Sequence, residues 1–247
     1  MVSHNPQELT WALVIATYNR RHILPRCLRL ALQQTRLPAE VVVVDASPDW
    51  EALRAEIMRE VAEDRTSARP EGRHPIKWRY VEAERRSSAF QRNQGVRLAT
   101  ADVLFLIDDD SLMYPDCAEA ILRIYEADPD GVVAGVNAMH VPLPPDHPDD
   151  PEALHPSIHG TTRQYGPTAR MVRRILRAED LFVPYDAEFP RHPLPPALRR
   201  PEIGTRELMA GWGMTFRRSI CEREPFDEIM TRYAAGEDSD MGYRASR

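Results

Sequence analysis

The chain has 247 residues, of which 43% are hydrophobic and 28% are charged, and its formal net charge is −6 at pH 7. This balance is typical of a folded globular protein and excludes an extended disordered chain, which would hold fewer apolar residues. The longest apolar runs, VVVV and VLFLI, fall far short of the ~20 residues that cross a bilayer, so no membrane span is predicted.

Charge and cysteine content exclude further classes. A net negative chain is a poor general nucleic-acid binder, because phosphates require a cationic face. The amino end lacks a basic start followed by a long apolar core, so no signal peptide is expected. Three widely spaced cysteines, Cys27, Cys117 and Cys221, fit neither a disulfide framework nor a metal-binding motif. We therefore expect reduced, buried thiols in a cytoplasmic protein.

In the first half of the chain, short apolar runs alternate with stretches of helical periodicity. Buried strands are predicted over residues 10–17, 39–47, 76–83 and 102–110, and helices over 21–35, 50–64, 88–100 and 111–125. Continuous apolar strands that alternate with helices indicate a mainly parallel sheet covered on both faces. The predicted fold class is therefore α/β, of the doubly wound, Rossmann-like type.

Three of the predicted strands end in polar residues. The segment 17–20 follows the first strand, Asp45 ends the second, and an aspartate trio at 108–110 ends the fourth. In doubly wound sheets the ligand crevice lies beyond the carboxyl ends of the strands. We therefore expect these three strand ends to share one site.

From about residue 141 the sequence becomes rich in proline, aspartate and histidine. Most of the 22 prolines lie in this section, so little regular structure is expected there apart from a helix over residues 168–181. We interpret it as an irregular excursion that builds one wall of the site; a long surface linker is the alternative. Regular structure is predicted again over residues 207–220 and 227–247. The chain stops just inside a predicted helix, which suggests truncation at the C-terminus.

The aspartate trio admits two interpretations. Like charges this close repel unless a cation lies between them, and oxygen-only ligands suit a hard divalent cation such as Mg²⁺ or Mn²⁺. A cation held by one or two carboxylates keeps positions open for substrate phosphates, so a metal-bridged diphosphate is the expected occupant. Because strand residues alternate sides, Asp108 and Asp110 are expected to point one way and Asp109 the other. The alternative is an acidic turn that caps the following helix.

A second acidic group, Glu237, Asp238 and Asp240, follows a glycine and leads into a helical stretch. These acids can serve a reaction, or they can be an acid-rich helix N-terminus that the helix dipole stabilises. The residues alone leave both interpretations open.

The order VIATYNR … VVVVDASPD … RNQGVRLATADVLFLIDDDS … GWGMTFRRS … FDE … GEDSDMGYR resembles the family 2 glycosyltransferases, which have the GT-A fold. The resemblance runs from about residue 11 to the last residue and is diffuse between about 141 and 205. It implies one GT-A domain over residues 1–247, with a nucleotide-sugar-binding half at about 11–135 and an acceptor-binding half at about 136–247. It also implies inverting transfer of a sugar from a nucleotide-diphosphate donor to a hydroxyl acceptor, usually with Mg²⁺ or Mn²⁺.

On the donor side, the resemblance implies a role for each motif residue. The nucleotide pocket would be shaped by Thr17, Tyr18 and Arg20. Asp45 would accept a hydrogen bond from the base, most readily from N3–H of uracil, so that a UDP-sugar is the expected donor. Residues along the nucleotide and its diphosphate would be Arg92 and Asn93. In the trio, Asp110 would ligate the metal, Asp108 would contact the ribose or a metal-bound water, and Asp109 has the least defined role.

On the acceptor side, the resemblance implies that Asp238 is the general base, with Glu237 beside it to help place the acceptor. Trp212 would lie near the donor sugar or the acceptor; a core tryptophan is the equal alternative. A sugar hydroxyl is a poor nucleophile, and a carboxylate within hydrogen-bond reach takes its proton as attack proceeds. The metal and nearby cations offset the charge that develops on the leaving nucleoside diphosphate.

The sequence also departs from the family pattern. Ala46 stands where the family often has a second acid or asparagine, and Ser47-Pro48 where Gly-Ser is common, so the base preference stays open. The basic motif typical of processive polysaccharide synthases is absent, which favours single additions to a carbohydrate, lipid-linked or small-molecule hydroxyl acceptor.

Two other functions remain open. Sugar-phosphate nucleotidyltransferases use a related sheet and acidic metal ligands, but they usually carry a Gly-rich loop after the first strand, and ATYNRRHILP has no glycine. A non-catalytic nucleotide-sugar-binding protein of the same fold is the second alternative, and the intact Asp110 and Asp238 argue against it.

Overall fold

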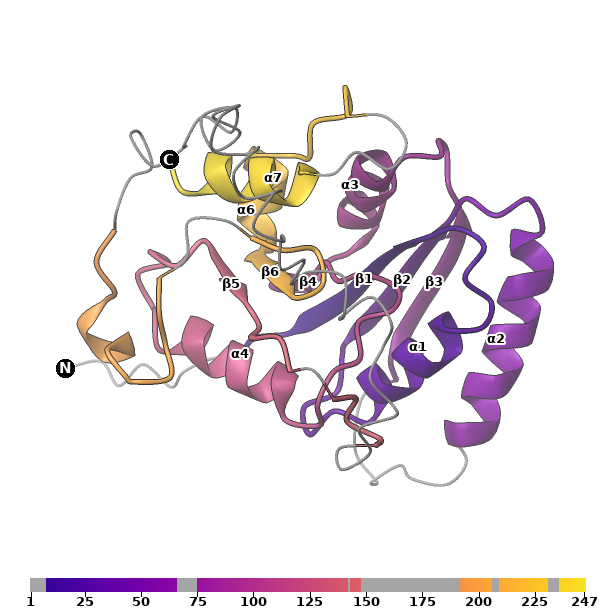
Figure 1. The fold of residues 1–247 in the computed structure, drawn as a ribbon, viewed down its shortest axis with the longest axis horizontal. Helices are drawn as coiled ribbons and strands as arrows, with labels where there is room; N and C mark the ends of the chain where they lie inside the picture. The colour runs from indigo at the N-terminus through magenta and orange to yellow at the C-terminus, as the bar shows by residue number, and fades with distance from the viewer. Residues whose placement is uncertain (1–7, 66–74, 142, 148–191, 206–208, 231–235) are drawn as a thin grey trace, which may run out of the picture. The chain divides into compact units, whose positions relative to one another are not determined.

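The computed structural model describes residues 8–65, 75–141, 143–147, 192–205, 209–230 and 236–247. Within these ranges, six strands form one sheet in the order β3-β2-β1-β4-β6-β5 (Figure 1). The strands are β1 (Trp11–Thr17), β2 (Glu40–Asp45), β3 (Lys77–Glu82), β4 (Val103–Phe105), β5 (Gly135–Asn137) and β6 (Met214–Arg217).

Strand directions divide the sheet into two parts. β1 pairs in parallel with β2 and β4, and β2 pairs in parallel with β3, whereas β6 runs antiparallel to both β4 and β5. The predicted α/β class with a mainly parallel, Rossmann-like sheet is confirmed. Because β6 reverses direction, the residues that precede it lie at the same edge of the sheet as the residues that follow β4.

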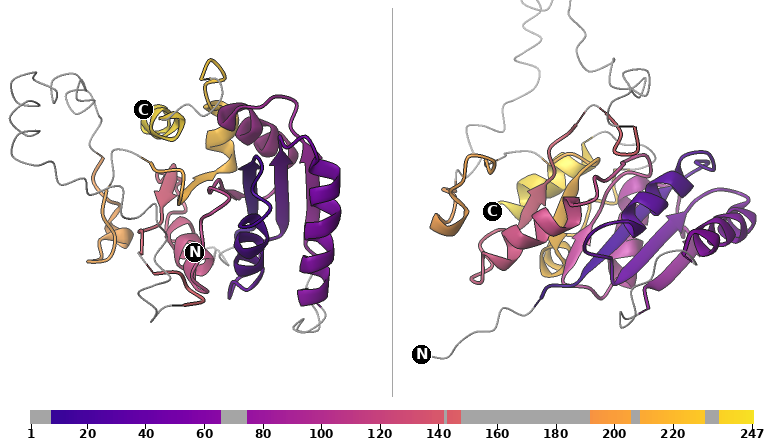
Figure 2. Two further views of the ribbon diagram at one scale, coloured as in Figure 1. Left: turned by 45° about the vertical axis from the view of Figure 1, so that its right-hand side comes forward. Right: turned by 90° about the horizontal axis from the view of Figure 1, so that it is seen from below.

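Helices cover both faces of this sheet (Figures 1 and 2). One face carries α1 (Leu24–Leu32), α2 (Trp50–Arg65) and α4 (Cys117–Glu126); the other carries α3 (Ser88–Leu98), α6 (Arg218–Arg223) and α7 (Glu237–Ala245). In β1, Leu13 and Ile15 pack on the first face, and Ala12 and Val14 on the second, and all four are 0% exposed. Burial on both faces explains why the strands read as continuous apolar runs.

Several element boundaries differ from those predicted. β4 ends at Phe105, although the apolar run continues to Ile107. The helix predicted from residue 111 begins at Cys117, because Pro115 disfavours a helical backbone at the residue before it. A short 3₁₀ helix, η4, spans Pro196–Leu198.

Other predictions fall on residues that the structure does not describe, including the helix over 168–181 and most of the proline-rich section. The chain divides into two compact units, residues 1–139 with 192–247, and residues 140–191. Every residue of the site below belongs to the first unit, and the single-domain organisation stays a prediction. In the described ranges, no helix is both long and apolar enough to cross a membrane. All three cysteines are free thiols, with Cys27 and Cys221 buried and Cys117 partly buried.

Candidate functional site

The carboxyl ends of the first strands are joined directly. Thr17 and Asp45 are register partners on β1 and β2. The Thr17 hydroxyl, which is buried, donates a hydrogen bond of 2.7 Å to the carboxylate of Asp109. From α3, the Gln91 amide donates to the carbonyls of Thr17 and Val44, both at 2.9 Å. The three polar strand ends therefore lie together, as their positions in a parallel sheet predicted.

The aspartate trio forms a turn. The Ser111 N–H donates to the Asp108 carbonyl at 3.1 Å. Asp109 is 8% exposed, whereas the side chains of Asp108 and Asp110 are 42% and 33% exposed. The predicted alternation is wrong: Asp109 and Asp110 both contact Arg20, whereas Asp108 contacts Arg92, because the three residues follow the end of β4 and lie in a turn.

The alternative interpretation of the trio as a helix cap is wrong. Helix α4 begins at Cys117, and its N-cap residue is Asp116, several residues beyond the trio. The thiol of Cys27, buried on α1, instead lies under the turn and donates to the Ser111 carbonyl at 3.2 Å. The backbone of the turn is thus fixed by a buried residue of α1, and the three aspartate side chains do not cap α4.

Arg20 supplies a positive charge beside the trio. Its Nε lies 3.5 Å from a carboxylate oxygen of Asp109, and its Nη2 lies 3.9 Å from one of Asp110. Burial raises the pKa of Asp109 from 3.8 to about 6, although the Thr17 hydrogen bond and Arg20 act to lower it. Partial burial also raises the pKa of Asp108, against the effect of Arg92. These acids are incompletely neutralised, so a further cation would stabilise their ionised forms.

Asp45 lies at the floor of the site and is 1% exposed. One carboxylate oxygen accepts hydrogen bonds from the N–H and hydroxyl of Ser47 (2.8 and 2.5 Å), and the other accepts one from the Tyr80 hydroxyl (2.6 Å). The Ser47 hydroxyl oxygen in turn accepts from the N–H of Asn19 at 2.8 Å, where the backbone has a φ of 55°. Asp45 therefore fastens the loop after β1 to the loop after β2. Only the remaining lone pairs of its two oxygens can accept a hydrogen bond from a nucleotide base.

Tyr18 carries a cation on one face of its ring. The Arg86 guanidinium, from the loop between β3 and α3, lies 3.5 Å from the ring centroid. Tyr18 is half-buried and Arg86 is exposed. Cation–π attraction holds this pair together at the rim of the site.

Arg92 and Asn93 are consecutive residues of α3, and both are buried, with 4% and 6% exposure. The two Nη groups of Arg92 donate to Asp108 (2.8 Å) and to Glu237 (2.5 Å). The Asn93 amide exchanges two hydrogen bonds of 2.9 Å with the backbone of Phe226. The structure thus directs Arg92 toward the two acidic groups and Asn93 toward the segment that follows α6.

The second acidic group begins α7. Gly236, with a φ of 112°, is the N-cap residue, and Glu237, Asp238 and Asp240 lie in the first turn. The Asp238 carboxylate accepts one hydrogen bond from the N–H of Gly211 at 2.8 Å and another from its own helix at 2.7 Å. Asp240 pairs with Arg244 along the helix at 2.9 Å. Glu237 and Asp238 therefore meet the aspartate trio, whereas Asp240 belongs to the surface of α7.

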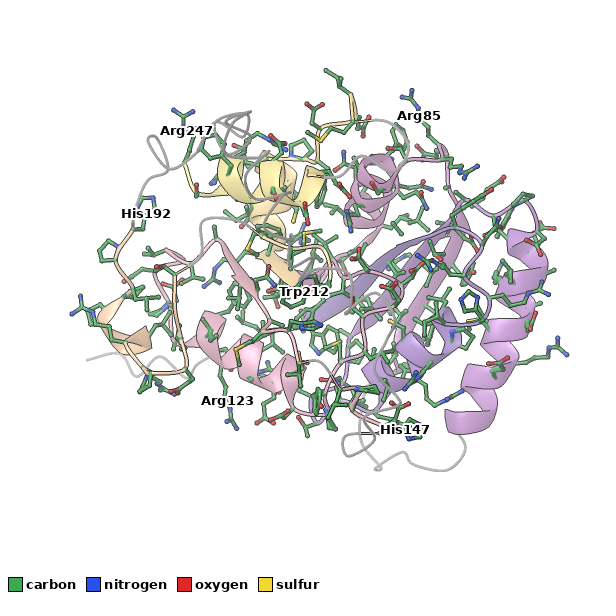
Figure 3. All side chains as sticks on the ribbon, viewed as in Figure 1. Arg85, Arg123, His147, His192, Trp212 and Arg247 are labelled. Atoms are coloured by element: carbon green, nitrogen blue, oxygen red, sulfur yellow. The ribbon has the colours of Figure 1, made fainter. Side chains whose placement is uncertain are left out.

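The segment 210–213, immediately before β6, connects the two acidic groups. Gly211 accepts a hydrogen bond of 3.1 Å from the Asp108 N–H and donates its own N–H to Asp238. The Asn137 side chain, at the end of β5, accepts from the N–H of Ala210 at 2.6 Å. Trp212 is half-buried and lies beside β6 in the view of Figure 3.

Some residues of the site were missed in the sequence. Gln91, Tyr80 and Gly211 are not charged, so neither charge nor spacing marks them as functional. Gln91 did carry a signal, because it is a polar residue next to Arg92 in a helix predicted to pack on a sheet. Gly211 lies in the GWG stretch, whose glycines mark close backbone approach.

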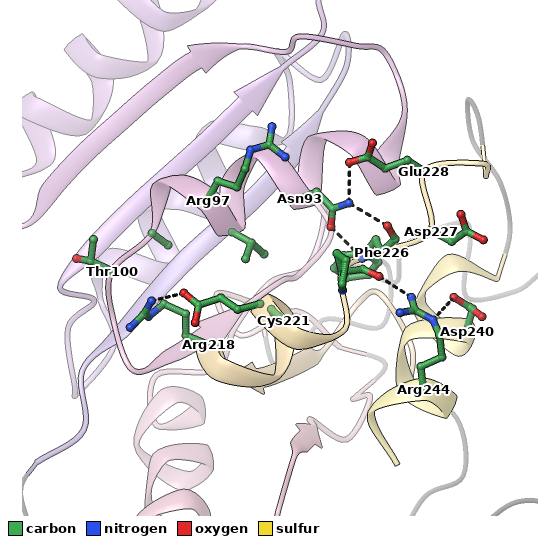
Figure 4. A pocket seen from close by; sticks show the side chains of 14 residues that line it. Asn93, Arg97, Thr100, Arg218, Cys221, Phe226, Asp227, Glu228, Asp240 and Arg244 are labelled. Carbon is green, nitrogen blue, oxygen red and sulfur yellow. Dashed lines mark hydrogen bonds and ion pairs between the residues drawn. The ribbon is translucent and has the colours of Figure 1, made fainter. Parts of the chain in front are cut away.

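A groove of about 970 Å³ is lined by α3, α6, the segment 225–228 and part of α7 (Figure 4). Two of its cations are paired within its own walls, Arg218 with Glu222 and Arg244 with Asp240. Among the predicted site residues only Asn93 lines it. This groove is therefore distinct from the group of polar residues at the carboxyl ends of the strands.

The trio has the chemistry of a partial metal site. Within the described part of the chain, no three His, Cys, Asp or Glu side chains are grouped so as to hold a metal by themselves. Asp110 nevertheless offers a partly exposed carboxylate beside two further acids. Mg²⁺ typically binds through one or two carboxylates plus water and substrate phosphates. The donor set, carboxylate oxygens alone, fits a hard divalent cation better than zinc.

Curated relatives match most of the chain. A validoxylamine A glucosyltransferase from Streptomyces hygroscopicus subsp. limoneus is 27% identical over 241 residues, which are 94% of this chain and 47% of that protein. An uncharacterized glycosyltransferase from Haemophilus influenzae is 25% identical over 170 residues, which are 69% of this chain and 49% of that protein. The chain thus spans about half the length of the curated relatives that it matches.

Solved structures share the fold. A mannosyltransferase from Pyrobaculum calidifontis, in complex with GDP-Man and Mn²⁺, aligns with a TM-score of 0.54 at 19% identity over 96% of this chain and 52% of that one. TarS 1–349 from S. aureus, in complex with UDP, aligns with a TM-score of 0.54 at 12% identity over 96% of this chain and 55% of that one. The family model described as Glycosyl transferase family 2 matches residues 12–170. The chain belongs to glycosyl transferase family 2 and has the GT-A fold.

Proposed function

We propose that the chain is a metal-dependent, inverting glycosyltransferase that moves a sugar from a UDP-sugar to a hydroxyl acceptor. The observation that carries the proposal is the meeting of two acidic groups at one sheet edge. The trio follows β4, Glu237 and Asp238 begin α7, and Gly211 bonds to both Asp108 and Asp238. Family membership favours this reaction over nucleotidyl transfer.

The donor would lie across the carboxyl ends of β1, β2 and β4. We assign the walls of the nucleotide pocket to Thr17, Tyr18 and Arg20, and the base contact to Asp45. The geometry limits that last contact, because Ser47 and Tyr80 already bond to the Asp45 carboxylate. The mannosyltransferase and TarS structures contain GDP-Man and UDP, so related folds accommodate both a guanine and a uracil nucleotide. The choice of uridine rests on Asp45 alone.

Mg²⁺ or Mn²⁺ would be held by Asp110, with Asp108 and Asp109 beside it. When bound, the cation would offset the negative charge that develops on the leaving nucleoside diphosphate. Arg20, in the loop after β1, has a side chain that is 45% exposed; it lies near both Asp109 and Asp110 and adds positive charge beside the turn. Asp109 is buried and accepts a hydrogen bond from the Thr17 hydroxyl, which orients the turn.

Asp238 would act as the general base. Its carboxylate is oriented by two backbone N–H groups, one from Gly211 and one from its own helix, and it is only partly buried. As the acceptor oxygen attacks the anomeric carbon, its proton passes to this carboxylate. Inversion needs one displacement, so one base on the face opposite the leaving group suffices. Trp212, beside Gly211, would contact the donor sugar or the acceptor.

The first test is donor binding. Titration calorimetry with UDP, GDP, ADP and CDP should detect binding only when Mn²⁺ or Mg²⁺ is present, and UDP should bind most tightly. EDTA should abolish the heat, because the diphosphate and Asp110 share the cation. Equal binding in EDTA would refute metal dependence, and preference for another base would refute the role of Asp45. Hydrolysis of UDP-sugars without an acceptor would identify the sugar and exclude a non-catalytic binding protein.

The second test separates the base from the metal ligand. Asp238→Asn should lower transfer by at least about 10²-fold while the donor still binds, because a base typically contributes 10²–10⁴-fold. Asp110→Ala should weaken donor binding itself, measured by the same calorimetry. If both variants lost donor binding to the same extent, the assignment of the base would be wrong.

A further inference from the structure

We propose that Arg92 is a positioning residue that holds Asp108 and the Glu237–Asp238 pair in one fixed arrangement, and that it does not bind the donor. The inference rests on the proposed function, because it concerns the geometry of that same site. It replaces the role along the diphosphate that the family resemblance implied for Arg92.

Four contacts close a ring through Arg92. Its guanidinium donates to Asp108 at 2.8 Å and to Glu237 at 2.5 Å. Asp238, the next residue along α7, accepts from the N–H of Gly211 at 2.8 Å. The Gly211 carbonyl then accepts from the N–H of Asp108 at 3.1 Å, which returns the ring to its start. Four segments distant in the chain, at α3, after β4, before β6 and at α7, thereby fix one another.

The burial of Arg92 leaves little of it for a ligand. The residue is 4% exposed, and its guanidinium lies 5.7 Å from the centroid of the Phe226 ring. Both Nη groups are committed to carboxylates, and the buried Nε has no hydrogen-bond partner among the described residues. A phosphate could reach this cation only by displacing Asp108 or Glu237. Displacement of Glu237, whose side chain is 10% exposed, would leave a buried carboxylate without its cation, which is strongly unfavourable.

The residues of the ring pack closely around Gly211, with little space for a larger side chain. A Cβ added to this residue would lie 3.1 Å from Arg92 Nη2 and 3.1 Å from a carboxylate oxygen of Asp108. The backbone there has no positive φ, so an alanine is sterically opposed by these two side chains and not by its own conformation. Gly204 offers a matched control, because a Cβ added there meets nothing within 4 Å.

The decisive experiment compares donor affinity with turnover in Arg92→Lys and Arg92→Gln. We expect the dissociation constant for UDP with Mn²⁺ to stay within about 3-fold of the parent value. The kcat for transfer should fall by about 10- to 100-fold in Arg92→Gln, because a misplacement near 1 Å costs about 100-fold. Lysine keeps the charge but cannot make both contacts, so it should restore part of the loss. A rise in the dissociation constant that parallels the fall in kcat would overturn the proposal, as would an unchanged kcat.

A second variant keeps the proposal testable if the Arg92 variants do not fold. The Gly211→Ala methyl group would displace the side chains of Arg92 and Asp108 without removal of any charge. We expect kcat to fall while donor affinity is kept. Gly204→Ala should match the parent chain in both quantities. Equal kcat values for Gly211→Ala and Gly204→Ala would show that the ring geometry does not matter for transfer.

The ring can also be tested without any substrate, which separates this inference from the proposed function. A double-mutant cycle with Arg92→Gln and Glu237→Gln, followed by urea unfolding, measures their coupling directly. We expect Glu237→Gln to cost less than half as much in the Arg92→Gln background as in the parent. Additive effects would refute the ring itself. Clear coupling in a chain that binds no nucleotide sugar would leave the ring standing and refute the proposed function.

Discussion

Asp109 is the most buried acid of the trio, and its surroundings set a pH dependence of stability. Burial raises its pKa from 3.8 to about 6, so between these values the folded chain retains a proton that the unfolded chain has released. The free energy of unfolding contributed by this group therefore falls as the pH rises from about 4 to about 6, and stays low above that. At neutral pH the ionised Asp109 destabilises the metal-free fold.

Asp109→Asn should remove this cost. In EDTA at about pH 7.5, we expect the variant to be more stable than the parent by about 1–3 kcal/mol, since one pKa unit corresponds to about 1.4 kcal/mol. The advantage should vanish near pH 4, where the parent carboxyl is protonated. Urea unfolding of both chains across this range measures the difference. A variant that is less stable at every pH would mean that the bonds to Thr17 and Arg20 outweigh the burial of charge.

At this level the sequence indicates which residues carry charge to the site, but not which partners they find. The acids at 108–110 and 237–238 were predicted from strand ends and motif order. The partners of Arg92 depend on how α3 rotates on the sheet and on where α7 lies, 145 residues further on. Asp45 likewise accepts a hydrogen bond from Tyr80 on the neighbouring strand, and no local sequence pattern indicates this contact. Long-range packing decides such contacts.

Helix α3 shows how closely one element must approach the sheet to build the site. A Cβ added at Gly95 would lie 2.4 Å from Cγ1 of Val14 on β1, which is far inside van der Waals contact. The glycine therefore allows α3 to pack directly on the strands. This close packing brings Gln91 and Arg92, one turn earlier on the same helix, to the strand ends.

Gly95→Ala should destabilise the fold by about 1–3 kcal/mol, the usual cost of overpacking a core. Val14→Ala removes the clashing methyl groups, so the combined variant should lose less than the sum of the two single changes. Urea unfolding measures all three, with Gly204→Ala as the neutral control. Strict additivity would show that α3 shifts away from β1 instead of straining against it.

The elements themselves were unequally predictable. The first four strands and the helices between them are long or strongly apolar, and their order follows from alternation alone. β5 and β6 have 3 and 4 residues, and in the sequence such short runs resemble loop segments. Their antiparallel direction depends on the path of the chain between them, and the proline-rich composition of that connection does not indicate this path.

For the whole molecule, ligand binding and folding should be linked. A ligand that binds only the folded chain, at about 100 times its dissociation constant, adds about 2.7 kcal/mol to the free energy of unfolding. We expect this gain with Mn²⁺ and UDP together, and little with either alone, because the proposed site is completed by both. Urea unfolding in the four conditions tests it, and Asp110→Ala should abolish the gain. Full stabilisation by UDP in EDTA would contradict the metal-bridged arrangement.

The pairing of β5 with β6 has a consequence for how such proteins diversify. Asn137 and Met214 are register partners, although more than 70 residues separate them in the sequence. The chain therefore leaves the sheet and returns to it at neighbouring points, and the entropic cost of a longer or shorter excursion between them grows only slowly with its length. The β5–β6 pairing holds both ends of this excursion at the edge of the sheet. Relatives can therefore differ in the length of this excursion without loss of the β5–β6 pairing, provided that Gly211 and its hydrogen bonds to Asp108 and Asp238 are kept.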